Sequence, residues 1–206
     1  MKTKHFLLAV IILMCSGWLI SSCERTSDEY IDSYKEEILP PEDITSNFTT
    51  GNDGWKISGD AQQVDAEFDS QGGFIWADDN TTGGVWYYEA PSKYLGNKED
   101  AYGGKIKFSL KVDQIDAQFE AEDLILESSN MTIAFNTSYN PGVNWTDYEV
   151  VISASAGWTV GDNNGPTATE SQIRSVLSNL TRFRIRGEFR TGYDTGALDN
   201  VEFPGV

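Results

Sequence analysis

Aromatic side chains are the residues best suited to bind a ligand in this 206-residue chain, which contains 6 Trp, 9 Tyr and 10 Phe. Exposed Trp and Tyr rings stack on the faces of sugars, because each ring combines a flat apolar surface with a polar group. A glycan site is therefore predicted at four aromatic residues: Trp76, Trp86, Tyr88 and Trp145. The alternative for each residue is packing in the core. Along residues 85–89, either Trp86 and Tyr88 or Val85 and Tyr87 must face inward.

Acidic loop segments are candidates for calcium binding, since calcium prefers carboxylate and carbonyl oxygens. They lie at residues 78–80, 162–164 and 194–199. None has the spacing of an EF-hand loop. By analogy with jelly-roll binding modules, one structural calcium ion near the chain ends is predicted, with Asp60 and Asp199 as its ligands. The alternative is turn chemistry, in which Asp and Asn side chains hydrogen-bond their own backbone.

Paired carboxylates are the groups that glycoside hydrolysis requires. The closest pairs in the sequence are Glu122 with Asp123, and Glu188 with Asp194. Adjacent residues of a strand point to opposite faces, which weakens the first pair. Glu188 stands beside Arg186 and Arg190, so ion pairing explains its position more simply. The chain is therefore predicted not to be an enzyme, with a carboxylate-dependent glycoside hydrolase as the less favoured alternative.

Basic residues are concentrated in one stretch that contains Arg182, Arg184, Arg186 and Arg190. The planar guanidinium group suits acidic glycans or carboxylate ligands. The alternative, neutralisation of neighbouring acidic strands, is preferred because the formal net charge is -17.

Short strands are expected to position these residues. In residues 105–112, Ile106, Phe108, Leu110 and Val112 alternate with polar side chains, which indicates a strand with one buried face. Similar runs at 74–77, 85–89, 124–126, 131–135, 149–152 and 182–186, and one that begins near Leu198, give about eight or nine short strands. Such a set favours two packed sheets, so the prediction is an all-β, galactose-binding-like jelly-roll β-sandwich.

One short helix is predicted at residues 169–180, at one end of the sandwich. Thr169 and Gln172 form a capping box, in which each side chain can bond the other residue's backbone N–H. The apolar residues Ile173, Val176, Leu177 and Leu180 then recur at helical spacing.

The first 22 residues have the pattern of an export signal. Lys2 and Lys4 precede an apolar run that is short for a transmembrane helix. Small residues then precede Cys23, which resembles a bacterial lipobox and predicts lipidation there; the alternative is an ordinary signal peptide with an incidental cysteine. Cleavage before Cys23 would leave no histidine and no second cysteine, and would thus exclude Ser–His–Asp sites and His/Cys zinc sites.

Residues 23–47 are predicted to be an acidic tether, followed by one domain at 48–206. Loss of Lys2 and Lys4 would bring the formal charge to about -19, with 13 Lys and Arg against 32 Asp and Glu. This acidity argues against nucleic acid as a partner and leaves the lipid on Cys23 as the membrane contact. Acidic residues after Cys23 resemble a surface-export signal of Bacteroidetes lipoproteins. The predicted location is therefore the cell envelope at the outer membrane, with the periplasmic or the surface side left open.

An ordered set of motifs carries a family resemblance over residues 48–203: GDAQ (59–62), GGVWYYEAP (83–91), KYLGNKEDAYGG (93–104), AEDLIL (121–126), NPGVNWTDYEV (140–150), SASAGW (153–158) and LDNV (198–201). The chain resembles the laminin domain IV (laminin B) family, a module inserted between the EGF-like repeats of laminin arms. Those cysteine-rich repeats are absent here, so roles that depend on a laminin arm do not carry over. The resemblance implies a non-enzymatic adhesion or ligand-binding module, whose partner is a glycan or an extracellular or envelope protein. The alternative is a purely structural or protein-interaction module.

Overall fold

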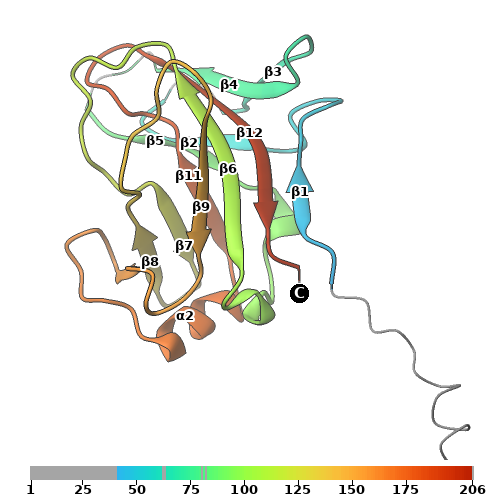
Figure 1. The fold of residues 1–206 in the computed structure, drawn as a ribbon, viewed down its shortest axis with the longest axis vertical. Coiled ribbons are helices and arrows are strands. Elements are labelled where there is room, and N and C mark those ends of the chain that lie inside the picture. The colour runs from blue at the N-terminus through green and yellow to red at the C-terminus, as the bar shows by residue number, and fades with distance from the viewer. Residues whose placement is uncertain (1–40, 62–63, 80, 82, 206) are drawn as a thin grey trace, which may run out of the picture. The chain divides into compact units, whose positions relative to one another are not determined.

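The computed structural model describes residues 41–61, 64–79, 81 and 83–205 (Figure 1). The predicted export signal, Cys23 and the first part of the predicted tether lie outside the described residues.

Two antiparallel sheets pack face to face. The first, called the β12 sheet, has the order β3 (Glu67–Asp69), β4 (Phe74–Asp78), β12 (Thr195–Phe203), β6 (Lys105–Val112) and β9 (Thr146–Val151), and β1 (Ile44–Ser46) also pairs with β12. The second, called the β11 sheet, has the order β10 (Thr159–Val160), β8 (Thr132–Phe135), β7 (Leu124–Glu127), β11 (Arg182–Arg186), β5 (Trp86–Glu89) and β2 (Lys56–Gly59). The prediction of an all-β jelly-roll sandwich is confirmed, although the described residues form 12 strands rather than eight or nine.

β12 is the central strand of its sheet. Its first half pairs with β4 and its last three residues pair with β1, while β6 runs along its other side. A register shift between Asp199 and Glu202 separates the two halves, and Asn200 lies within it with a φ of 52°. Asn tolerates this left-handed conformation better than most residues, so the irregularity fits the sequence at that point.

The core lies between the two sheets and is rich in aromatic rings. Ile106, Phe108, Leu110 and Val112 of β6 are at most 3% exposed, which confirms the predicted alternation of that strand. Other rings that fill the core with 0% exposure include Trp55, Trp86, Tyr88, Tyr94, Trp158, Phe183 and Phe203. Apolar burial of this size is the main stabilising contribution to such a fold.

Three helical segments are present in the described residues: η1 (Ser92–Tyr94), η2 (Glu99–Ala101) and α2 (Glu170–Leu177). α2 lies at one end of the sandwich (Figure 1). Both hydrogen bonds of the capping box at Thr169 and Gln172 are present, as predicted. The helix ends before the predicted residue 180, because the backbone of Leu180 pairs with Gly96 instead.

The sandwich begins earlier than the predicted boundary at residue 48. β1 lies within the predicted tether, yet each of its residues pairs with β12. The tether prediction is therefore wrong for residues 44–46. Three residues are too few to show an alternating pattern, so this strand could not be predicted from the sequence.

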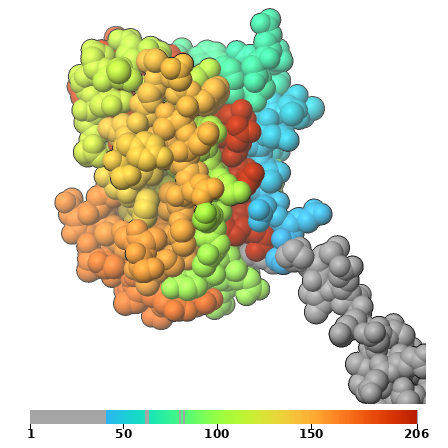
Figure 2. Space-filling model, viewed as in Figure 1, coloured from blue at the N-terminus to red at the C-terminus, as the bar shows by residue number. Residues whose placement is uncertain are grey.

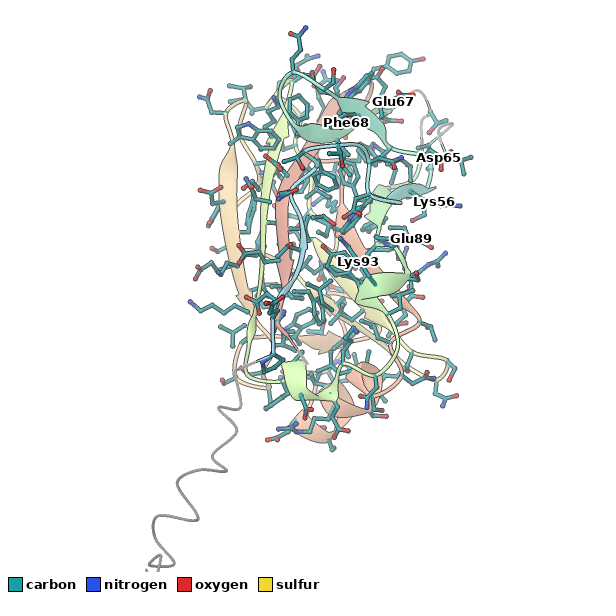
Figure 3. The ribbon with its side chains drawn as sticks, turned by 90° about the vertical axis from the view of Figure 1, so that its right-hand side faces the viewer. Lys56, Asp65, Glu67, Phe68, Glu89 and Lys93 are labelled. Atoms are coloured by element: carbon teal, nitrogen blue, oxygen red, sulfur yellow. The ribbon has the colours of Figure 1, made fainter. Side chains whose placement is uncertain are left out.

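Along one edge, the segment between β2 and β3 connects the two sheets. Lys56 of β2 forms an isolated antiparallel bridge with Asp65, which lies two residues before Glu67 of β3. Figure 3 looks at this edge and shows Lys56 beside Asp65, with Glu67 and Phe68 above them. The chain therefore passes from the β11 sheet to the β12 sheet within a few residues.

Candidate functional site

A row of three residues crosses the outer face of the β12 sheet. Ala197 at the centre of β12 pairs with Trp76 of β4 on one side and with Lys111 of β6 on the other. The inner-facing neighbour Leu198 is fully buried, whereas Trp76 and Lys111 are half-buried. Figure 2 views this sheet, with β12 (red) visible between β6 (green) and the N-terminal strand (blue).

A groove of about 370 Å³ lies along this row. It is lined by Asp69, Phe74, Trp76, Lys111, Val112, Asp113, Val143, Thr195 and Ala197, and is called the aromatic groove. The small side chain of Ala197 leaves the floor low between the larger residues on β4 and β6. The groove therefore exists because a small residue, Ala197, pairs with two large ones, Trp76 and Lys111.

Trp145 borders the groove just before β9. Its ring packs edge-on against Phe74, with the ring centroids 5.4 Å apart and an interplanar angle of 74°. The Lys111 ammonium lies 4.0 Å from the Phe74 centroid and 4.6 Å from the Trp145 centroid. Cation–π attraction of this kind holds the two rings and the ammonium together, so that Trp145 stays in place although it is 39% exposed.

Polar groups stand around the aromatic surface. Asp69 accepts the amides of Gln71 and Gly72, at 2.9 and 2.7 Å, and Asp113 accepts the amide of Thr195 at 3.0 Å. A third carboxylate, that of Asp199, lies on β12. Burial raises its pKa, and the positive charge of Lys111 acts to lower it. Each carboxylate retains capacity to accept hydrogen bonds. The groove therefore combines flat apolar rings with fixed acceptors.

The structure divides the four predicted aromatic ligands into two groups. Trp76 of β4 lines the aromatic groove, and Trp145, in the segment before β9, packs against Phe74 and Lys111, two of the residues that line it. Trp86 and Tyr88 are 0% exposed in the core, so the prediction that these two bind a ligand is wrong. Tyr88 donates its hydroxyl to the carbonyl of Gly196 at 2.6 Å, which satisfies its polar group inside the sandwich.

Residues that the sequence analysis missed contribute much of the groove. Phe74 and Lys111 belong to strands that were predicted, and their outward orientation follows from alternation with buried neighbours. Ala197 precedes Leu198, near which the closing strand was predicted to begin, because β12 starts earlier, at Thr195. What was not visible is the pairing of β4 and β6 with β12, because these strands are far apart in the sequence.

The two predicted calcium ligands do not form one site. Asp60 follows β2 in the β11 sheet, where its carboxylate accepts the amide of Gly84 at 2.7 Å. Asp199 lies in the β12 sheet and accepts the amide of its neighbour Asn200 at 2.7 Å. Among the described residues, no group of three or more His, Cys, Asp or Glu is arranged to hold a metal ion. Calcium binding stays a prediction.

The arginine stretch is neutralised by neighbouring carboxylates, which is the interpretation that the sequence favoured. Its ion pairs are Arg182 with Glu89 and Glu127, Arg184 with Glu127, Arg186 with Asp123, and Arg190 with Asp116. Arg186 is fully buried and also donates to the carbonyls of Phe119 and Glu188, at 2.7 and 2.5 Å.

Glu188 and Asp194 form part of a buried acidic cluster. Glu188 accepts the amide of Trp86 at 3.3 Å, and Asp194 accepts the amide of Phe189 at 3.4 Å. Burial, with the nearby charges of Asp79 and Asp194, raises the pKa of Glu188 to about 7. Burial also raises the pKa of Asp194 to about 7, and Asp79 adds to the shift. The prediction that ion pairing with Arg186 and Arg190 explains Glu188 is wrong, since those arginines pair with Asp123 and Asp116.

Comparison with known proteins places the chain in a family. The model of the Laminin B (Domain IV) family matches residues 87–204. Human laminin subunit gamma-1 is 29% identical over 170 residues, which cover 77% of this chain and 10% of that protein. A basement membrane proteoglycan of Caenorhabditis elegans is 29% identical over 133 residues, covering 64% of this chain and 4% of that protein.

Among solved structures, the L4b domain of human laminin alpha-2 has the same fold, with a TM-score of 0.62 and 14% identity over 79% of this chain and 98% of that domain. The chain spans about a tenth of the length of the laminin gamma-1 that it matches. The family match covers more than half of the chain and agrees with the motifs distributed through both sheets. The chain therefore belongs to the laminin B (domain IV) family.

Proposed function

We propose that this laminin B module is a non-catalytic binding domain and that its aromatic groove binds glycans. The observation that carries the proposal is a groove of about 370 Å³ that is lined by Trp76, Ala197 and Phe74, with the Trp145 indole packed against Phe74 at its edge. A sugar ring fits between flat side chains above a small residue, with its apolar face on an indole.

The polar groups of the groove support the same assignment. Sugar hydroxyls donate hydrogen bonds, and the carboxylates of Asp69 and Asp113 accept them. The Lys111 ammonium, which lies over two rings, offers a donor for a hydroxyl or ring oxygen. Ligand sites commonly combine a mostly apolar surface with a few fixed polar groups of this kind.

Family membership favours a second candidate, a structural or protein-interaction module. Its named relatives are laminin subunits and a basement membrane proteoglycan. Near the groove, Val143 is 52% exposed, and an exposed apolar side chain of this kind also suits a protein partner. On this account the surface around Trp145 would contact an extracellular or envelope protein rather than a glycan.

An array of glycans and matrix proteins separates the two candidates. The purified full chain is applied with calcium and with EDTA, beside a Trp145→Ala variant. Binding to a glycan class that Trp145→Ala abolishes supports the glycan proposal. Binding to matrix proteins alone supports the second candidate, and loss of binding in EDTA supports a calcium ion. Absence of binding to every glycan by folded protein contradicts the glycan proposal.

We also propose that the chain is exported and anchored in the cell envelope by a lipid on Cys23. No helix among the residues that the structure describes is long and apolar enough to cross a membrane. A Cys23→Ser variant tests the anchor. It should move from the membrane fraction to the soluble fraction, whereas unchanged fractionation would contradict lipidation at this residue.

A further inference from the structure

A second hollow of about 160 Å³ adjoins the aromatic groove. It is called the acidic hollow and is lined by Asp78, Asp79, Asp113, Gln114, Tyr193, Asp194 and Thr195. Asp113 and Thr195 also line the aromatic groove. Because the two share lining residues, a ligand that continues past Thr195 passes from one into the other.

The floor of both follows a single stretch of chain. Ala197 lies in the aromatic groove, Thr195 at the junction and Tyr193 in the acidic hollow, each two residues from the next. Thr195 and Ala197 belong to β12, so they share one face of the strand and lie about 7 Å apart. Tyr193 lies in the bend that precedes β12 and lines the acidic hollow together with Asp194 and Thr195. Tyr193 is 65% exposed, so a second aromatic surface stands beyond the junction.

Most of the polar groups of the acidic hollow are carboxylate acceptors. Asp194 is 3% exposed, and its Oδ1 has no hydrogen-bond donor among the residues that the structure describes. Asp113 accepts the amide of Thr195, and the Thr195 hydroxyl donates to Asp78 at 2.6 Å. Such a surface receives hydroxyl donors and repels carboxylate or sulfate groups.

Lys111 does not reverse this preference. Its ammonium lies over the rings of Phe74 and Trp145, and it is the one basic residue among those that line the two hollows. Four aspartates line the acidic hollow, although Asp194, whose pKa is raised to about 7, is only partly charged at neutral pH, and a fifth, Asp69, lines the groove. The combined surface is therefore acidic, and an anionic sugar chain would bind against unfavourable charge.

We propose that the aromatic groove and the acidic hollow form one continuous site for an unbranched, uncharged glycan chain, with Tyr193 stacking on a sugar beyond the junction at Thr195. This inference rests on the proposed function and specifies the length and the charge of its ligand. Two aromatic surfaces on either side of a shared junction require a ligand of several sugar units.

Isothermal titration with two series of oligosaccharides tests the inference. The probes are cello-oligosaccharides of two to six units, which are uncharged, and oligogalacturonides of the same lengths, which are anionic. The proteins are the full chain and its variants Tyr193→Ala, Tyr193→Phe and Trp145→Ala. Tyr139→Ala is the matched control, since Tyr139 is 52% exposed and lines neither hollow.

We expect affinity for the uncharged series to rise about tenfold from the shortest oligomer that binds to the longest. Tyr193→Ala should remove this rise without weakening the shortest complex, and Tyr193→Phe should keep it. Trp145→Ala should weaken every complex, Tyr139→Ala none. Oligogalacturonides should bind at least about tenfold more weakly.

The opposite results separate the two proposals. The affinity could depend on Trp145 and yet be the same for every oligosaccharide length and unchanged in Tyr193→Ala. That result would overturn the continuous site and leave the proposed function intact. Equal or tighter binding of oligogalacturonides would overturn the assigned charge of the ligand. No binding of either series by folded protein would overturn this inference, whereas the glycan function itself is contradicted only by absence of binding to every glycan on the array.

Discussion

Trp145 and Phe74 meet edge to face above the β12 sheet, with ring centroids 5.4 Å apart, although they come from segments on opposite sides of β12. Lys111 stands within cation–π distance of both rings. This contact fixes the border of the aromatic groove, because it holds a half-exposed indole in one position. The proposed function depends on that border.

Replacement of Trp145 by Ala removes the stacking surface with little effect on the core. Because Trp145 is 39% exposed, we expect the free energy of unfolding to fall by about 1 kcal/mol or less. Glycan affinity should fall about tenfold or more. Thermal unfolding and isothermal titration measure the two effects. Trp145→Phe, which keeps an aromatic ring, should lose much less affinity, and equal loss in both variants would count against stacking.

Replacement of Ala197 by Ile should block the groove from its floor. The added side chain projects between Trp76 and Lys111, the register neighbours of Ala197, and fills space rather than removing a contact. A β-branched residue suits a strand, but Ala197 is 3% exposed, so the larger side chain must displace its neighbours and we expect the free energy of unfolding to fall by about 1 to 3 kcal/mol. Glycan binding should be lost, whereas Ala197→Ser should retain it. Full binding by a folded Ala197→Ile variant would place the ligand elsewhere.

Because Glu188 and Asp194 are buried carboxylates with raised pKa values, we expect the stability of the protein to fall as pH rises. Both folded-state pKa values are about 7, above the ordinary values of 4.5 and 3.8, so the native state binds more protons than the unfolded state between about pH 4 and 7. Their favourable contribution is complete below about pH 4 and is lost through pH 7. Chemical denaturation at pH 5 and pH 8 should differ by about 2 to 3 kcal/mol for each of the two carboxylates.

A Glu188→Gln variant provides the control for this pH dependence. The neutral amide removes the cost of a buried charge, so the variant should be more stable than the unmodified protein at pH 8 and similar to it at pH 4. Its stability should vary less between these pH values. A pH profile that is unchanged by the substitution would show that Glu188 titrates normally.

The buried pair of Arg186 and Asp123 should contribute strongly to stability through its partners. Arg186 is fully buried, and its ion pair with Asp123 spans 3.3 Å. Asp123→Asn would leave the guanidinium without its charge partner, so we expect a loss of about 3 kcal/mol in the free energy of unfolding. Asp116→Asn is the matched comparison: Asp116 pairs with Arg190 at the surface, where solvent screens the charges, and its loss should have a much smaller effect. Similar losses for both variants would contradict this ranking.

The sequence indicated the fold because strand alternation and helix capping are local. The alternation in β6 and the capping box at Thr169 are both present as expected. β1 and β3 have three residues each, too few for any pattern to appear. Family motifs supported the sandwich fold, whereas the strand order, which no local pattern contains, was not predicted.

The candidate site was harder to predict because it depends on which faces are covered. On β5, Trp86 and Tyr88 face the core, but Tyr87 on the other face is also buried. Its ring centroid lies 5.0 Å from the guanidinium carbon of Arg184. Alternation alone could not show which pair was inside. The aromatic groove depends on Ala197, whose small size acquires meaning through its pairing with Trp76 and Lys111.

Acrylamide quenching of tryptophan fluorescence tests the central claim most directly. In a Trp18→Phe background, five tryptophans remain, of which Trp55, Trp86 and Trp158 are 0% exposed, so quenching reports on Trp76 and Trp145. A glycan found on the array should protect these two indoles, with lower quenching and a blue-shifted emission, and Trp145→Phe should reduce the protected signal. Glycan binding that leaves the quenching unchanged would show that the ligand lies outside the aromatic groove and would contradict the account.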